Sequence, residues 1–234
     1  MELDRWLDRQ DAPEADWAPH VVRLANTGGL GRTAGILLDL PALGQPWGCA
    51  TRACAPGLRA VAHRSCCADL EVGVGVEEIE GITGALEGIA AEMAGDSRWA
   101  DGVPAWHRDG ALRRPGRRCV FARSGPDGLA CGLHRTEDTR GLPRGTLKPL
   151  PCRLFPLAIV DLGDRRLLTA VHRTTARFLG SLPATRFPCL GAGSAPLARA
   201  EVATLQQLFG VGAAERIARA VEAWSGEHAV PTLT

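Results

Sequence analysis

The chain has 234 residues, 45% of them hydrophobic, which is enough for one sizeable domain or two small ones with a packed core. Its formal net charge is +1, so bulk electrostatics draws it toward neither nucleic acid nor anionic lipid. The acidic start MELDRWLDRQ lacks the basic and apolar regions of a secretory signal, and no apolar run reaches the roughly 18 residues of a membrane span. We therefore expect a cytoplasmic protein that binds neither nucleic acid nor membrane.

In chain order, the first predicted elements are short. We expect a helix in LDRWLDRQ, and then a strand, a turn and a strand, with residues 21–24 and 36–40 as the two apolar runs around a Gly-rich centre. That centre lacks the lysine of a phosphate-binding P-loop, so a hairpin is the simpler interpretation. Residues 58–63 are predicted to form another short strand.

The next segment changes its apolar period. Alternation over residues 70–74 predicts a strand, and the helical spacing over residues 79–93 predicts an amphipathic helix of about four turns that stops at Gly95. We interpret its acidic residues as a solvated face and favourable N-terminal charges, rather than as acid–base pairs. They are Glu77, Glu78, Glu80, Glu87 and Glu92.

The second half of the chain has clearer patterns. Residues 113–118 form a basic run that is typical of an exposed loop and that would favour the thiolate form of Cys119. Residues 157–162 and 166–171 predict a hairpin joined by Gly-Asp. The segments AEVATLQQLFG and AAERIARAVEAW have helical spacing and are predicted to be helices packed onto the domain.

The cysteines carry the functional signal. A reducing cytoplasm disfavours disulfides and leaves thiolates available for metal or redox chemistry. Clustering argues against the alternative of unrelated buried thiols, and the lack of an export signal argues against a disulfide framework. The eight residues are Cys49, Cys54, Cys66, Cys67, Cys119, Cys131, Cys152 and Cys189.

Their spacing is typical of a thiolate metal site. Short loops supply chelating pairs, here Cys49-x4-Cys54 and Cys131-x2-His134, and distant cysteines complete the site through tertiary structure. Neighbouring side chains on a strand point to opposite faces, so the pair at residues 66–67 suits a turn at a cluster, or two adjacent sites. Because thiolates already outnumber the positions of one site, we interpret His134 as a polar loop side chain rather than a ligand.

These residues carry a resemblance to a known family. The order is Cys-x4-Cys, then Cys-Cys before an apolar strand and an acidic helix, then Cys-Val-Phe, Cys-Gly-Leu-His and Lys-Pro-Leu-Pro-Cys-Arg-Leu-Phe-Pro-Leu. Over residues 47–162 it resembles the zinc- or iron-chelating cysteine-cluster proteins of the YkgJ-like group. The loop of residues 55–65 is longer than in those proteins.

The resemblance implies a ligand set and a surrounding shell. It implies that Cys54, Cys66, Cys67, Cys119, Cys131 and Cys152 are metal ligands, with Cys49 and Cys189 added in the branch that has the Cys-x4-Cys start. Arg153 either stabilises the thiolates by hydrogen bonding or forms a surface ion pair. Phe155 and Pro156 are expected to pack over the site.

The metal and the activity stay open between alternatives. Eight thiolates exceed one four-thiolate zinc site and fit a [4Fe–4S] cluster or two centres, and the cysteines lack the regular knuckles of zinc ribbons, so we favour iron–sulfur over zinc. The expected function is metal binding, with redox or protein-modifying activity at an open metal position. The alternative is a non-catalytic, zinc-stapled module that binds a protein partner. A cysteine hydrolase using His107, His134 or His172 is a weaker third hypothesis, and no substrate is indicated.

The predicted fold class is α+β. We expect a single metal-stapled, loop-rich domain with short strands or hairpins and peripheral helices. Its segments are an N-terminal helix and hairpin at residues 1–45, the cysteine-cluster metal-binding domain at 46–192, and a C-terminal helical tail at 193–234 packed on the same domain.

Overall fold

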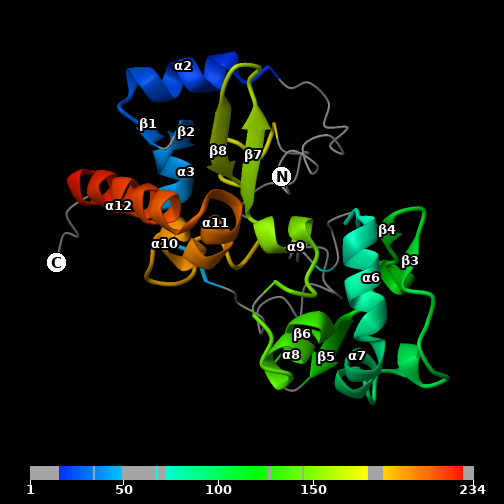
Figure 1. Cartoon of the computed structure of the whole chain (residues 1–234). Helices are drawn as coiled ribbons and strands as arrows, with labels where there is room; N and C mark the ends of the chain where they lie inside the picture. Colours follow the sequence, from blue (N-terminus) through cyan, green and yellow to red (C-terminus); the bar gives the residue numbers. More distant parts are fainter. Residues whose placement is uncertain are drawn as a thin grey trace. The chain divides into compact units, whose positions relative to one another are not determined.

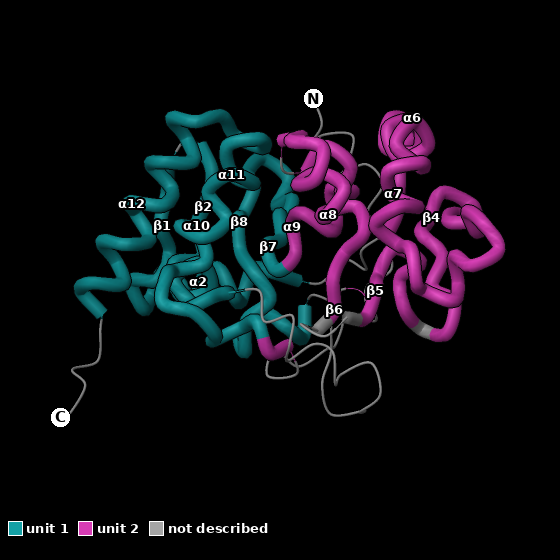
Figure 2. The backbone as a smooth tube through the Cα atoms, turned by 90° about the horizontal axis from the view of Figure 1, so that it is seen from below, with its two compact units in different colours: residues 1–49, 156–185, 189–234 teal, residues 50–155, 186–188 magenta. Residues whose placement is uncertain are grey.

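The computed structural model describes residues 16–33, 35–48, 67, 72–125, 128–143, 145–178 and 187–228. The chain divides into two compact units (Figure 2). Unit 1 contains Met1–Cys49, Pro156–Thr185 and Cys189–Thr234, and unit 2 contains Ala50–Phe155 and Arg186–Pro188. The three segments expected from the sequence are each continuous in the chain, whereas unit 1 is assembled from separate stretches on both sides of unit 2.

A mixed β-sheet explains why unit 1 is discontinuous. Its described strands are β1 (Leu30–Thr33), β2 (Ile36–Asp39), β7 (Leu157–Asp161) and β8 (Arg166–Ala170), in the order β1-β2-β8-β7 (Figure 1). The β1–β2 and β7–β8 pairs are antiparallel, and β2 runs parallel to β8. Strands from both sides of the inserted unit 2 therefore complete one sheet.

Five helices are described in unit 1. The C-terminal helices α10, α11 and α12 form a group next to α3 (Figure 1). Buried leucines from both halves of the chain, including Leu38, Leu43, Leu168 and Leu197, fill the core between the strands and these helices. The helices are α2 (Ala18–Asn26), α3 (Leu40–Gly44), α10 (Leu197–Ala200), α11 (Val202–Phe209) and α12 (Val211–Glu227).

The core of unit 1 also contains a buried, hydrogen-bonded His–Asp pair. His20 Nε2 lies 2.8 Å from Asp39 Oδ2, and both side chains are fully buried. Arg23 lies 2.6 Å from His20 Nδ1. Because a guanidinium only donates, Nδ1 accepts and Nε2 carries the hydrogen that is donated to Asp39. Thr169 Oγ1 and the Ala42 N–H donate to the same carboxylate, which ties α2, α3 and β8 together.

Two predicted elements of unit 1 are confirmed and one is wrong. The hairpin of β7 and β8 and the helices near the C-terminus form where the sequence predicts them. Residues 21–24, predicted as a strand, belong to α2, whose first turn contains a proline. Leu24 is buried while Val22 is 58% exposed, which is the alternation of a helix lying on a surface. The predicted hairpin is formed instead by β1 and β2.

Unit 2 consists of short helices and two small two-stranded sheets. The sheets pair β3 with β4 and β5 with β6, both antiparallel. Its described elements are α6 (Val76–Gly84), α7 (Leu86–Glu92), η1 (Ser97–Trp99), β3 (His107–Arg108), β4 (Ala111–Leu112), η2 (Pro115–Arg117), β5 (Ala122–Gly125), β6 (Gly128–Cys131), α8 (Gly132–Thr139) and α9 (Leu150–Leu154).

The helix predicted in this unit forms with different limits, whereas the strand predicted at residues 70–74 is reduced to an isolated bridge in its described part, residues 72–74. Gly73 makes an isolated bridge to Ala111, and the neighbouring backbone extends this pairing to β4. The helix predicted over residues 79–93 is divided into α6 and α7 at Ala85, and α7 ends at Glu92, three residues before Gly95. Gly95 has a positive φ of 87°, which suits a residue just beyond a helix end.

One hydrophobic cluster forms the core of unit 2. Phe121 is fully buried, and the rings of Trp99 and Trp106 lie 5.9 and 5.6 Å from it. Helices α6, α7 and α8 contribute the buried aliphatic side chains Ile82, Ile89, Met93 and Leu133. The cysteine-bearing segments are built on this core.

The α+β class is therefore confirmed in its mixture of helices and sheets. Within the described part of the chain, no helix is both long and apolar enough to cross a membrane. The helix predicted in LDRWLDRQ and the strand predicted at residues 58–63 lie outside the described residues.

Candidate metal centre

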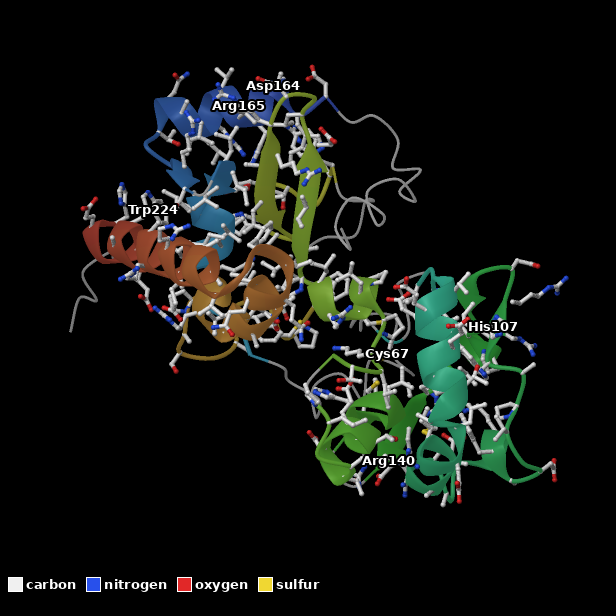
Figure 3. The ribbon with its side chains drawn as sticks, viewed as in Figure 1. Cys67, His107, Arg140, Asp164, Arg165 and Trp224 are labelled. Atoms are coloured by element: carbon white, nitrogen blue, oxygen red, sulfur yellow. The ribbon has the colours of Figure 1, made fainter. Side chains whose placement is uncertain are left out.

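Five of the predicted ligands fall in the described residues. Cys67, Cys119, Cys131 and Cys152 belong to unit 2, in which Cys67 is labelled in Figure 3. Cys189 is buried in unit 1, and its carbonyl accepts a hydrogen bond from the Gly48 N–H at 3.2 Å. The predicted ligands Cys49, Cys54 and Cys66 lie outside the described residues.

Cys119 lies in a tight turn that is tied to Cys67. The Cys119 N–H donates to the Cys67 carbonyl at 2.6 Å, and the Ala122 N–H donates back to the Cys119 carbonyl at 2.9 Å. A turn with this second bond is a β-turn. The backbone on both sides of the Cys119 side chain is therefore held in place.

Side chains from η1 support the same turn. Arg98 donates one N–H to the Cys119 carbonyl at 2.9 Å and another to the Ala122 carbonyl. The Trp99 indole N–H donates to the Val120 carbonyl at 3.1 Å. Neither residue was predicted as part of the site, because a side-chain donor to a backbone carbonyl 21 residues away leaves no periodic signal in the sequence.

The β5–β6 hairpin brings Cys131 close to the Cys119 turn. Cys131 is the partner of Ala122 in the strand register, and directly opposed residues have Cα atoms about 4.5–5.5 Å apart. The next N–H, that of Gly132, donates to the Phe121 carbonyl at 2.7 Å. Cys131 is also the N-cap of α8 and so lies at the positive end of the helix dipole.

The contact between α7 and α8 positions Cys131. Glu92 accepts hydrogen bonds from Arg135 Nε at 2.8 Å and from Thr139 Oγ1 at 2.7 Å. The bond from Arg135, followed by that from Thr139, lowers the pKa of Glu92, so this carboxylate stays ionised at neutral pH. At the other end of α8, a Cβ on Gly132 would lie 2.6 Å from Met93 Sδ, which shows how closely the two helices approach.

Two carboxylates hold the segment that carries Cys152. Glu78 accepts from the Gly75 N–H and from the Leu150 N–H, each at 2.8 Å, and so links the first turns of α6 and α9. Glu137 is fully buried and accepts from three backbone N–H groups, at 3.1 Å from Gly145, 2.7 Å from Leu147 and 2.9 Å from Lys148.

The role of Glu78 can be predicted in part from the sequence, whereas the role of Glu137 cannot. Glu78 is the third residue of α6, and its carboxylate accepts the N–H of the N-cap residue Gly75, so the predicted N-terminal charge is correct for this residue. Its bond to Leu150 is an additional role that joins distant segments. Glu137 sits in an ordinary polar helix sequence, and only the fold shows that it is buried.

Positive charge is concentrated beside the Cys119 turn. Arg98 forms a two-point contact with Asp96, with Nε–Oδ1 at 2.9 Å and Nη2–Oδ2 at 2.8 Å, and Arg118 lies 3.4 Å from the same carboxylate. The hydrogen bond from Arg98 lowers the pKa of Asp96. Burial, and then the charge of Arg98, lower the pKa of Arg118. Asp96 is only 5% exposed, so these charges interact with little screening by solvent.

The remaining predicted site residues are placed as follows. Arg153 and His134 are half-buried, on α9 and α8. Phe155 packs on Phe187, with ring centroids 4.9 Å apart. Of the two other histidines weighed for a hydrolase, His107 packs on Trp106, and His172 lies in unit 1, where it is bonded to Thr174.

Three of the described cysteines pack against the same hydrophobic core, but the described residues do not form a complete set of metal ligands. Cys119, Cys131 and Cys152 are each partly buried and pack against the hydrophobic core cluster of unit 2. Among the residues that the structure describes, no group of three or more His, Cys, Asp or Glu side chains is arranged to hold a metal ion. A four-thiolate centre in this unit would also draw on cysteines outside the described residues, Cys54 and Cys66.

Comparison of the chain with protein-family models, with curated proteins and with solved structures finds no match.

Proposed function

We propose that the cysteine-rich unit 2 binds a metal centre through thiolates, and that this centre is an iron–sulfur cluster rather than zinc. Its ligands would come from Cys67, Cys119, Cys131 and Cys152 together with the cysteines outside the described residues. Cys189, which belongs to unit 1, is a ligand candidate through the YkgJ-like resemblance alone and is not assigned to the centre in unit 2. The protein would act in the cytoplasm, where thiols stay reduced.

One observation carries the proposal. The Cys119 turn is bonded to the Cys67 carbonyl on one side and is paired with the Cys131 strand on the other, so three cysteine-bearing segments meet through backbone bonds. Cys67 is also the neighbour of Cys66 in the sequence, so a fourth thiol is linked to the same place by a single peptide bond. Sulfur-rich sites assembled from short loops and distant segments suit iron–sulfur or zinc binding.

A second candidate function is a structural zinc staple. It is favoured by the way in which Cys119, Cys131 and Cys152 pack against the core cluster of unit 2, because a closed metal site at a core stabilises a small, loop-rich unit. In this case the unit would present its surface to a protein partner and would have no redox or protein-modifying activity.

Anaerobic purification followed by analysis of iron, zinc and acid-labile sulfide tests both candidates. An iron–sulfur protein will be brown, will contain iron and sulfide in equal amounts, and will lose its colour on exposure to air or chelators. A colourless protein with stoichiometric zinc would support the staple. A colourless protein that holds neither metal, and whose unfolding is unchanged by chelators, would refute metal binding altogether.

A further inference from the structure

Among the described residues, the charge around the Cys119 turn is not balanced. Arg98 and Arg118 share the single carboxylate of Asp96, so one positive charge is left over in this cluster. The two guanidinium side chains are only 17% and 23% exposed, so water compensates this charge incompletely.

The excess charge lies next to a proposed ligand. Arg98 Nη1 donates directly to the carbonyl of Cys119, and Arg118 precedes Cys119 in the chain. A half-buried cation is stabilised by a nearby anion, and a four-thiolate site on zinc or on a [4Fe–4S] cluster carries net negative charge. A negatively charged centre bound by Cys119 would therefore balance the excess positive charge of Arg98 and Arg118.

We infer that Arg98 and Arg118 form a cationic clamp that stabilises negative charge on a centre bound by Cys119 and so sets its reduction potential or its metal affinity. This inference rests on the proposed function. The two arginines act in different ways. Arg98 positions the turn because it binds the Cys119 and Ala122 carbonyls, whereas Arg118 binds only Ser124 and Asp96 among the contacts described and contributes chiefly charge.

This difference allows charge to be separated from geometry. Arg118→Gln removes a positive charge and leaves the carbonyl contacts of Arg98 in place. Arg98→Lys keeps the charge but loses the planar fork that binds two carbonyls and Asp96. Asp96→Asn removes the negative charge and so increases the positive excess. Ser124→Ala removes a partner of Arg118 without changing any charge, and Arg108→Gln removes a charge that is 82% exposed, which controls for net charge.

The experiment is a redox titration of the anaerobically purified protein, or a chelator competition if the metal is zinc. Arg118→Gln is expected to make the reduction potential more negative, or to weaken zinc binding roughly tenfold. Asp96→Asn is expected to shift the potential in the opposite direction. Arg98→Lys should keep a potential near that of the wild type while it lowers metal occupancy. The two controls should behave as the wild type.

The signs of these shifts decide the result. A purely structural role predicts that Arg118→Gln and Asp96→Asn change the centre in the same direction, and that Arg98→Lys changes it most, and this pattern would overturn the clamp. If Arg118→Gln does not yield folded protein, the sign of the Asp96→Asn shift decides alone. If the wild-type protein holds metal but neither Arg118→Gln nor Asp96→Asn changes its reduction potential or metal affinity, only the clamp is refuted. If the wild-type protein holds no metal, the proposed function is refuted as well.

Discussion

The N–H of Cys119 donates to the carbonyl of Cys67 at 2.6 Å, which joins two cysteine-bearing segments that are far apart in the sequence. The same turn is held from the other side by Arg98 and is paired through Ala122 with Cys131. A backbone that is fixed at both neighbours presents its side chain in one position, which is what a metal ligand requires.

Replacing Cys119 or Cys131 is expected to reduce metal binding. Cys119→Ser and Cys131→Ser each remove a thiolate from segments that the backbone brings together, so the metal content after desalting should fall by half or more. Ser124→Ala, on the same hairpin, is the matched control and should retain its metal. Cys189→Ser tests the predicted ligand in unit 1. Full metal content in both Cys119→Ser and Cys131→Ser would exclude this turn from the site.

Glu137→Gln is expected to destabilise unit 2. The carboxylate is fully buried and accepts three backbone N–H bonds, so an amide leaves at least one of these donors poorly satisfied, at a cost of about 1–3 kcal/mol. Urea unfolding measures the loss, and hydrogen exchange at Leu147 and Lys148 should become faster. Glu87→Gln, on the exposed face of α7, should change stability by less than about 0.5 kcal/mol. Equal effects of the two substitutions would contradict the role assigned to Glu137.

Gly132→Ala should destabilise unit 2 whereas Gly88→Ala should not, although both glycines face the α7–α8 contact. A Cβ at Gly132 would lie 2.6 Å from Met93 Sδ and 3.3 Å from the Phe121 carbonyl, and Met93 is fully buried, so overpacking should cost about 1–3 kcal/mol. A Cβ at Gly88 would meet only the guanidinium of Arg140, an exposed side chain that can move (Figure 3).

Gly88→Ala should therefore be neutral, or stabilising by up to about 1 kcal/mol through its higher helix propensity. Thermal unfolding of the two variants beside the wild type measures the difference. If Gly132→Ala were as stable as Gly88→Ala, the close approach of α8 to Met93 would be refuted.

Asp39→Ala is expected to be among the most destabilising single substitutions in unit 1. It leaves His20, Thr169 and the Ala42 N–H without their shared buried acceptor, and each buried donor left unsatisfied costs about 1–3 kcal/mol. Asp164→Ala is the control, since Asp164 is 84% exposed beside Arg165 in the β7–β8 turn (Figure 3). Chemical denaturation should separate the two variants clearly, and similar midpoints would argue against a structural role for the buried pair.

The stability of unit 1 should fall at mildly acidic pH because of His172. Burial is the main cause that lowers the pKa of His172 below its usual 6.5, and Asp39 opposes the shift. His172 Nδ1 also accepts the Thr174 N–H, at a donor–acceptor distance of 3.4 Å, so protonation at that nitrogen breaks a contact of the turn. Because the unfolded chain binds this proton more readily, the stabilisation is complete above pH 6.5 and is lost as the pH falls through the pKa of the folded state.

Urea midpoints measured between about pH 7.5 and 5.5 should therefore decrease as the pH falls. His172→Gln should flatten this dependence, since glutamine keeps a polar side chain without titrating. An unchanged slope in His172→Gln would assign the pH dependence to another group.

The sequence by itself determined the elements whose pattern is local. The β7–β8 hairpin and the helices α11 and α12 follow from apolar periods of two and of 3.6 residues, and each was predicted where it occurs. The eight cysteines likewise identified the candidate chemistry, because their number and spacing are properties of the chain alone.

Only the tertiary structure decided how these elements combine. Residues 21–24 have an apolar run that fits a strand or a helix, and packing of Leu24 into the core of unit 1 selects the helix. The parallel pairing of β2 with β8 joins strands on both sides of unit 2, and the burial of Glu137 depends on N–H groups from another loop. The sequence period of a segment shows which of its faces is apolar. Which other segment covers that face depends on contacts between residues far apart in the chain, and these contacts form only when the chain folds.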